Sequence, residues 1–308
     1  MNKSYTVTEE LSGKRLDIAL RELDGTLSRA RIKKALEDDA VRLNGRRSSK
    51  GATVSAGDVI EIESDLVSDP NGPAVPTPDA ELTVALERAD LLVVDKPARQ
   101  PTAPLRANET GTLANALVGK YPELAGIGHS PREPGLVHRI DNETSGLVLV
   151  ARTAESFDVL SAALKAGEIE KSYLLLCEGE DFADEGTISY PLSDHPKDNR
   201  RVYACIHPRD VIRNAPRDAH TAYSVLKRAH GMSLVEVRVA KALRHQIRAH
   251  FSAMGFPLVG DELYGAKTNP ASRHALHASS IRFAGEGKVA PFEVSSPLPA
   301  DLQRLIDD

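Results

Sequence analysis

Apolar residues in the first 63 positions recur at the spacing of two short helices. Leu16, Leu20 and Leu23 lie on one helical face, which predicts an amphipathic helix over residues 14–24. Ser28 can cap a second helix a few residues later. The residues expected on the buried side of this second helix are Ile32, Ala35 and Leu36.

A strand pattern follows these helices. Val41-Arg42-Leu43 alternates and runs into Asn44-Gly45, a pair that favours a hairpin turn. A closing strand is expected at residues 59–62. Residues 64–79 carry four prolines and little periodicity, which predicts a semi-extended linker. The pattern therefore divides the chain into a small domain at 1–63, a linker at 64–79 and a large domain at 80–308.

In the large domain, short apolar runs of strand length are interleaved with helical patterns. The expected strands are residues 91–94, 147–150, 171–179 and 235–239, and the expected helices are residues 110–121 and 157–164. A further helical stripe of Ile247, Phe251 and Met254 places His245 and Arg248 together on a different face.

Composition is that of a globular protein, with 41% hydrophobic and 27% charged residues in 308. No apolar run approaches the roughly 18 residues of a membrane span, and no apolar segment follows the N-terminus as in a signal peptide. Cys177 and Cys205 are too few for a disulfide framework. We therefore expect a cytoplasmic protein without a membrane partner.

Positive charge is concentrated in two segments, although the formal net charge is -5. Basic residues exceed acidic ones by five between residues 27 and 50, and by four between residues 197 and 217. Each segment is either a solvated surface or a nucleic-acid contact, because binding follows the local potential rather than the net charge. The second segment is expected to be a mobile loop.

Residues 135–151 place a charged loop directly before a buried strand. His138, Arg139 and Asp141 lead through small polar residues into the apolar run 147–150. A carboxylate beside an arginine at such a point is held rigidly while one face stays open, which suits a catalytic group. The segment resembles the His-Arg-(Leu/Ile)-Asp-x-x-Thr-Ser-Gly signature of the RluA-like pseudouridine synthases. The resemblance implies that Asp141 is the essential catalytic residue.

Two later segments resemble further elements of that family. Lys171-Ser172-Tyr173 implies that Tyr173 is the active-site tyrosine, whereas the alternative is a core tyrosine with a satisfied hydroxyl. His245-Gln246-Ile247-Arg248 implies that Arg248 pairs with the catalytic aspartate. Residues 98–102 and 241–244 depart from the family pattern, so the local loop shape and substrate binding before Arg248 are left open.

The first 63 residues resemble the small RNA-binding domain named after ribosomal protein S-four, through Arg15-Leu16-Asp17, Ser28-Arg29, residues 41–45 and Gly57-Asp58. Lysines and arginines there would neutralise phosphates, which gives affinity with little base specificity. The RNA-binding residues expected in the whole chain are Arg15, Ser28, Arg29, Arg31, Lys33, Asn44, Lys50, Lys96, His138, Arg139, Thr144, Lys171, Arg200, Arg201, His245 and Gln246.

The chemistry implied by the resemblance breaks the bond between ribose and uracil, rotates the base and rejoins ribose to carbon 5. It needs no oxidant or external donor, so no cofactor and no metal are expected. A carboxylate can attack the sugar or take the proton at ribose carbon 2, and both roles need Asp141 ionised. Burial would raise its pKa, which an adjacent guanidinium would counter. The uridine must also leave its stack, where Tyr173 could receive it.

The expected fold is α+β: a catalytic domain with a mixed, largely antiparallel sheet and flanking helices and loops, preceded by a small α/β RNA-binding domain. We expect a monomer that isomerises uridine in structured RNA. The domain order resembles family members acting on large-subunit ribosomal RNA, and transfer RNA remains an alternative substrate.

Two other functions remain open. One is a non-catalytic RNA-binding or ribosome-assembly factor in which the altered turn at residues 241–244 has abolished catalysis. The other is a metal enzyme that uses the histidine pairs 245 and 250 or 274 and 277, although the glutamate of helical zinc hydrolases is missing. A measurement of turnover discriminates between these functions.

Overall fold

The computed structural model describes residues 3–25, 27, 29–49, 51–62, 72–106 and 108–307, except for the side chains of residues 30, 31 and 212–214. The predicted RNA contacts Ser28 and Lys50 lie outside these residues, as do the side chain of Arg31 and residues 64–71 of the predicted linker. The chain forms two compact units: Met1–Pro73 with Leu105–Glu109, and Ala74–Pro104 with Thr110–Asp308.

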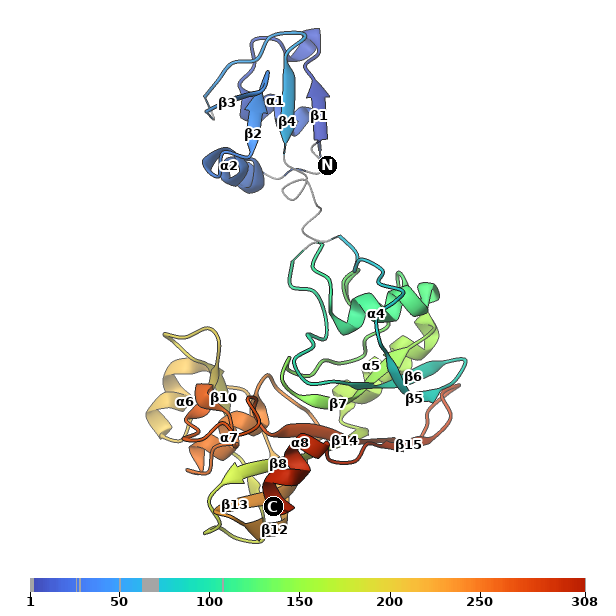
Figure 1. Cartoon of the computed structure of the whole chain (residues 1–308), viewed down its shortest axis with the longest axis vertical. Coiled ribbons are helices and arrows are strands. Elements are labelled where there is room, and N and C mark those ends of the chain that lie inside the picture. Colours follow the sequence, from blue (N-terminus) through green and yellow to red (C-terminus); the bar gives the residue numbers. More distant parts are fainter. Residues whose placement is uncertain are drawn as a thin grey trace. The chain divides into compact units, whose positions relative to one another are not determined.

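The first unit packs two helices on a four-stranded antiparallel sheet (Figure 1). Its strands are β1 (Lys3–Thr6), β2 (Val41–Leu43), β3 (Arg46–Arg47) and β4 (Val59–Ile62), in the order β1-β4-β2-β3. The single turn η1 (Glu9–Leu11) precedes the helices α1 (Leu16–Leu23) and α2 (Arg29–Glu37). The predicted helices and strands of this segment are confirmed.

Side chains in this unit lie where their periodicity predicted. Leu16 and Leu20 on α1 are fully buried, as is Ile60 on β4. The hairpin between β2 and β3 turns at Asn44 and Gly45, both with positive φ as its turn type requires. Asn44 also donates to the Asp58 carboxylate at 2.8 Å and accepts the Val59 N–H at 2.8 Å. The Asn44 side chain therefore fixes the hairpin to β4.

The second unit is built on a nine-stranded mixed sheet in the order β5-β6-β7-β14-β8-β13-β12-β9, with β15 paired to β14. These strands are β5 (Thr83–Glu87), β6 (Leu91–Lys96), β7 (Ser145–Ala151), β8 (Ile169–Glu178), β9 (Glu185–Ile188), β12 (Thr221–Ala229), β13 (Met232–Arg238), β14 (Leu276–Phe283) and β15 (Phe292–Ser295). Among the strands that the structure describes, only β7 and β14 pair in parallel. The predicted α+β class, with a largely antiparallel sheet, is confirmed.

Helices pack against both faces of β7 in this sheet and are labelled in Figure 1. The described helices of this unit are α4 (Leu113–Lys120), α5 (Ala154–Ala166), α6 (Pro208–Asn214), α7 (Gln246–Ala253) and α8 (Ala300–Asp307), with the short turns η2 (Pro122–Leu124) and η3 (Glu262–Tyr264). No helix within the described ranges is long and apolar enough to cross a membrane.

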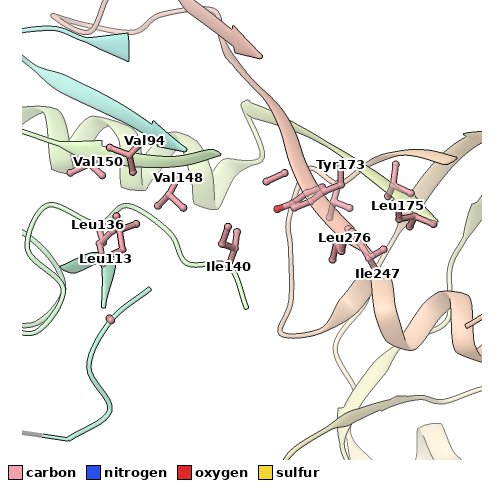
Figure 2. Packing of buried hydrophobic residues seen from close by; sticks show 14 of the residues in the cluster. Val94, Leu113, Leu136, Ile140, Val148, Val150, Tyr173, Leu175, Ile247 and Leu276 are labelled. Carbon is pink, nitrogen blue, oxygen red and sulfur yellow. The ribbon is translucent and has the colours of Figure 1, made fainter. Parts of the chain in front are cut away.

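Strand β7 contributes side chains to the apolar clusters on both faces of the sheet. All seven of its residues are buried, as expected for a strand covered on both faces. Leu147 and Leu149 pack with α5, whereas Val148 and Val150 belong to the opposite cluster with Leu113 of α4. Figure 2 shows this second cluster, in which the hydroxyl end of the Tyr173 ring is directed toward Ile140 and Val148.

Two segments differ from the sequence-based expectation. Residues 74–79, predicted as linker, are attached to the second unit, because Thr77 N–H bonds to Asn115 and Asn115 bonds back to Val75. Residues 197–217, predicted as a loop, contain β11 (Val202–Ala204) and α6. Strand β11 pairs with β10 (Leu192–Asp194), a partner that local periodicity does not reveal. His207 caps α6 by accepting the Arg209 N–H at 3.1 Å.

Candidate active site

Asp141 lies in the loop that precedes β7 and is held there by main-chain contacts. Thr144 N–H closes a turn onto the Asp141 carbonyl at 3.1 Å. The Thr144 hydroxyl contacts His274 Nε2 at 2.8 Å, and the next residue, Ser145, contacts His277 at 3.0 Å. Gly146 has a φ of 110°, and a Cβ there would collide with the main chain of Ala278 in β14. The loop is therefore pressed tightly against β14.

A second group of contacts holds the main chain on both sides of Asp141. The Thr102 hydroxyl donates to the Ile140 carbonyl at 2.7 Å. The Lys96 ammonium donates to the Asn142 carbonyl at 3.1 Å and to two carbonyls of its own turn, those of Pro97 and Gln100, at 2.9 and 2.7 Å. Both Lys96 and Thr102 are buried. The segment that departs from the family pattern thus supports the Asp141 loop.

Arg248 on α7 binds two carboxylates at once. Its Nη1 donates to Asp141 Oδ2 at 2.8 Å, while Nε and Nη2 bind the two oxygens of Asp261 at 2.7 and 2.8 Å. The Tyr264 ring lies 4.9 Å from the guanidinium carbon. The Asp261 side chain is 1% exposed and that of Asp141 26%. Of the two carboxylates, Asp141 is therefore the one that a ligand can reach.

The position of Arg248 depends on how α7 begins. His245 precedes the helix with a φ of 52°. The buried Gln246 side chain accepts the Leu243 N–H at 2.9 Å and donates to the His220 carbonyl at 2.9 Å. Arg244 donates to the Asn199 carbonyl at 2.7 Å. The altered turn at residues 241–244 is consequently anchored on both sides, and Arg248 keeps its place.

His245 is the second nitrogen-bearing side chain beside Asp141. Its Nε2 lies 3.6 Å from Asp141 Oδ2, and its Nδ1 lies 3.1 Å from the Tyr264 hydroxyl. Burial lowers the pKa of His245, so the ring is neutral at pH 7. A proton on Nε2 avoids directing a lone pair at the carboxylate, and the tyrosine hydroxyl can then donate to Nδ1.

The ionisation of Asp141 follows from these neighbours. Burial alone would raise the pKa of Asp141, but the positive charges of Arg248 and, at acidic pH where they are protonated, of His245 and His274 reverse this, and the pKa lies below the ordinary carboxyl value. His274 itself has a pKa lowered by burial to about 3, so it is neutral at pH 7. The permanently charged Arg248 is therefore the group that keeps Asp141 ionised.

Tyr173 lies on β8 in the apolar cluster and is 6% exposed. Burial and the Asp141 carboxylate both raise the pKa of its hydroxyl, so the phenol stays neutral. Within the described part of the chain, that hydroxyl makes no hydrogen bond, unlike the satisfied core tyrosine considered as the alternative. Asp141, Tyr173 and Arg248 thus come together from β8, α7 and the loop before β7.

Several predicted RNA contacts point inward instead. Lys96, Thr144 and Gln246 are at most 2% exposed and their polar atoms are bonded within the protein. His138 accepts the Leu149 N–H at 3.1 Å, and burial lowers its pKa to about 3. A neutral ring with its Nε2 occupied cannot attract phosphate through charge. Internal acceptors and donors already bind polar atoms of these four residues, and their contact with RNA remains a prediction.

The remaining predicted RNA contacts occupy varied positions. Lys171 is 5% exposed, and burial lowers its pKa to about 8. Arg139 is exposed and pairs with Glu133 at 3.0 Å. Arg15 pairs with Asp17, Arg200 with Asp198 and Lys33 with Glu37, and the Arg29 side chain is exposed on α2. These contacts, like that of Arg201, remain predictions.

Sequence reasoning missed Asp261, Thr102 and Tyr264 as parts of the site. Asp261 and Tyr264 belong to the run Gly260-Asp261-x-x-Tyr264-Gly265. The signal available in the sequence was an acidic residue directly after a glycine, and the structure shows that this glycine has a positive φ. Thr102 carried no such signal. The paired histidines suggested as metal ligands have other partners: His250 contacts Thr221 and Tyr190, and His277 contacts Ser145 and Ser296.

Comparisons with known proteins were made with this geometry in hand. Residues 90–253 match the family model described as RNA pseudouridylate synthase. The chain is 32% identical to the ribosomal large subunit pseudouridine synthase D of Xanthomonas campestris pv. campestris, over 99% of this chain and 91% of that protein. It is 33% identical to the protein of the same name from Yersinia pestis, over 99% and 93%.

A solved structure gives the same result. The human RNA pseudouridylate synthase domain containing 1 superposes with a TM-score of 0.58 at 25% identity, covering 70% of this chain and 83% of the human one. The human RNA pseudouridylate synthase domain containing 4 protein has a TM-score of 0.55 at 18% identity, covering 72% of this chain and 90% of the human one. This second comparison shows likeness of fold alone.

Replacing Arg248 by Leu should raise the pKa of Asp141 above its ordinary value, because burial remains and the guanidinium is lost. A ¹³C-carboxyl NMR titration measures this pKa. In the parent, the stability contributed by Asp141 is present above the unfolded pKa of about 3.9 and is lost as pH falls through the lowered folded value. In the variant that contribution should reverse its sign.

The same variant should lose about 3–5 kcal/mol of unfolding free energy, because Asp261 stays buried without its partner. Arg282→Leu is the matched control, since Arg282 is exposed and pairs with Glu170; it should change stability by no more than about 0.5 kcal/mol. An unchanged Asp141 pKa in the Arg248 variant would contradict the geometry described above.

Replacing Lys96 by Met should lower stability by about 3 kcal/mol, because three carbonyls lose a donor at roughly 1 kcal/mol each. RNA affinity of the folded variant should stay within about two-fold of the parent, because the ammonium is fully buried. Urea unfolding and an RNA titration measure the two quantities. Lys120→Met at the exposed end of α4 is the control. Weaker RNA binding by the Lys96 variant at unchanged stability would contradict a supporting role for Lys96.

Proposed function

The chain belongs to the RNA pseudouridylate synthase family, and from that premise we propose that it isomerises uridine in large-subunit ribosomal RNA through the Asp141 carboxylate. The observation that carries this role is the Arg248 guanidinium, which binds both Asp141 and the fully buried Asp261 and leaves only Asp141 open. The names of the bacterial relatives support ribosomal RNA over the transfer RNA alternative.

The isomerisation balances without another reactant. The bond between ribose C1′ and N1 of uracil breaks, and a bond between C1′ and C5 forms. The proton on C5 is lost and N1 is protonated, so no redox partner is consumed. Asp141 acts as a nucleophile at C1′ or as the base that takes the proton from C2′. Both roles require an ionised carboxylate, which the lowered pKa of Asp141 supports.

Tyr173 and Arg248 have supporting roles in this proposal. Tyr173 supplies an aromatic surface beside Asp141 on which a flipped uracil can stack, and its neutral hydroxyl is free to bind the base or relay a proton. Arg248 fixes the carboxylate oxygens through the Asp261 fork. Asp261, Thr102 and Lys96 act through these groups and do not touch substrate.

We propose that residues 1–63 form a separate S-four-like domain that binds the RNA backbone. Arg29 and Lys33 lie one helical turn apart on α2, and the Lys33 side chain is 60% exposed. Exposed cations on a helix neutralise phosphates without reading bases.

The two cysteines are buried and free, which fits a reducing compartment such as the cytoplasm. We also expect the protein to act as a monomer.

Replacing Asp141 by Asn should lower the single-turnover rate by about 10³-fold or more, because the amide is neither a base nor a nucleophile. Product is measured by mass spectrometry of digested RNA. The Kd for RNA should be unchanged or slightly lower, since one negative charge is removed. Asp158→Asn on the exposed side of α5 is the control, and normal conversion by the Asp141 variant would end the proposal.

Replacing Arg29 and Lys33 together by Gln should weaken RNA binding and leave the single-turnover rate at saturation unchanged. The slope of log affinity against log salt should become shallower by about 0.7–0.9 for each phosphate contact removed. Filter binding between 50 and 300 mM salt, in roughly equal logarithmic steps, measures the slope. Lys14→Gln with Arg21→Gln is the control on α1 and the residues before it. A slower rate with unchanged affinity would refute the proposed division of labour.

A further inference from the structure

The connection between β10 and β11 packs against the residues that support Asp141. Arg201 Nη1 donates to the Leu263 carbonyl at 3.4 Å, and Val202 N–H donates to the Tyr264 hydroxyl at 3.0 Å. The same hydroxyl contacts His245, which faces Asp141. One tyrosine therefore links this connection to the candidate active site.

Two N–H donors, one from His195 and one from Arg201, lie close together in this connection. His195 Nδ1 accepts the Asp198 N–H at 3.0 Å and the Lys197 N–H at 3.3 Å. Because an accepting Nδ1 carries no proton, the ring proton lies on Nε2. Arg201 Nη2 lies 3.3 Å from that Nε2. A guanidinium has no lone pair to offer, so this contact places two N–H donors face to face.

The nearby acid does not relieve the mismatch. Asp198 is bound by Arg200, whose Nε and Nη2 reach its two oxygens at 2.9 Å each. Arg201 Nε lies 3.8 Å from Asp198, too far for a hydrogen bond, and has no hydrogen-bond partner within the described residues. The Arg201 side chain is nevertheless 37% exposed, so a ligand from solvent can reach its guanidinium.

We propose that His195 and Arg201 form a binding site for a backbone phosphate of the substrate RNA, close to the target uridine. The proposal rests on the proposed function, which supplies the RNA. A phosphate oxygen placed between His195 Nε2 and Arg201 Nη2 would accept from both and convert the donor–donor contact into two charge-assisted hydrogen bonds. The exposed Lys197 side chain adds positive potential around this phosphate site, whereas the charge of Arg200 is offset by Asp198.

The position of the phosphate site gives it a further consequence. Arg201 and Val202 are adjacent, and Val202 holds the Tyr264 hydroxyl that contacts His245. A phosphate bound at Arg201 therefore fixes the strand that holds Tyr264, and through it the neighbourhood of Asp141. Binding of the RNA backbone and placement of the catalytic loop share one set of contacts.

The test compares Arg201→Gln and His195→Gln with the full-length parent. The probe is an unmodified transcript of large-subunit ribosomal RNA, and the readouts are Kd from 50 to 300 mM salt and the single-turnover rate at saturating protein. Arg201→Gln should weaken binding about five-fold near 0.1 M salt and make the logarithmic salt slope shallower by about 0.7–0.9, the loss of one phosphate contact. Arg282→Gln, which removes an exposed arginine on β14, should keep the parent slope.

Each outcome decides something. Parent-like slopes in both Arg201→Gln and His195→Gln would overturn the phosphate site. If Arg201→Gln lowers Tm by more than about 5 °C, His195→Gln decides alone, because it retains Arg201 and offers it a competing amide oxygen; it should weaken binding about two-fold. If Arg201→Gln has a shallower slope but neither the parent nor any variant forms pseudouridine, the proposed function is overturned and the phosphate site is retained.

Discussion

A buried guanidinium requires acceptors for its donors, and the contacts of Arg248 show how the site meets that requirement. Removing a cation from water is costly unless charge and hydrogen bonds replace the lost hydration. Asp261 accepts from two of its nitrogens and Asp141 from a third. One cation between two carboxylates leaves an excess of negative charge, and the half-exposed position of Asp141 lets water share it. The arrangement is stable because one of its carboxylates remains open, and that opening is what a substrate needs.

The sheet makes this geometry possible by bringing distant segments to one place. The parallel pairing of β7 and β14 sets the Asp141 loop beside His274 and His277, more than 130 residues away in sequence. Strand β8 lies next to β14 and presents Tyr173 from the same layer of apolar side chains. Strand β6 is the other neighbour of β7. Lys96 at its end and Thr102 in the following turn hold the main chain on either side of Asp141. The Asp141 loop is thereby fixed by Lys96 and Thr102 on one side and by His274 and His277 on the other.

The same framework connects the Asp141 site with the segment that we propose to bind phosphate. Tyr264 lies against Arg248, contacts His245 and holds β11. Its hydroxyl is therefore shared between the site that holds the carboxylate and the segment that carries His195 and Arg201.

Local pattern was enough to determine the elements with a clear periodicity and the position of the central acid, but it did not reveal β11 and α6 within residues 197–217. The alternation of residues 41–47 with Asn44-Gly45 dictated a hairpin, and the apolar run after Asp141 dictated a buried strand, because these depend on neighbours a few residues away. Tertiary structure decided which polar side chains face solvent. Lys96, Thr144 and Gln246 were predicted as RNA contacts from sequence, yet each bonds to a group from a distant segment. Lys96 and Gln246 donate to the carbonyls of Asn142 and His220, and Thr144 contacts His274. Asp261 and Thr102 became parts of the site in the same way, since burial and hydrogen-bond partners are set by non-local packing that no short stretch of sequence encodes.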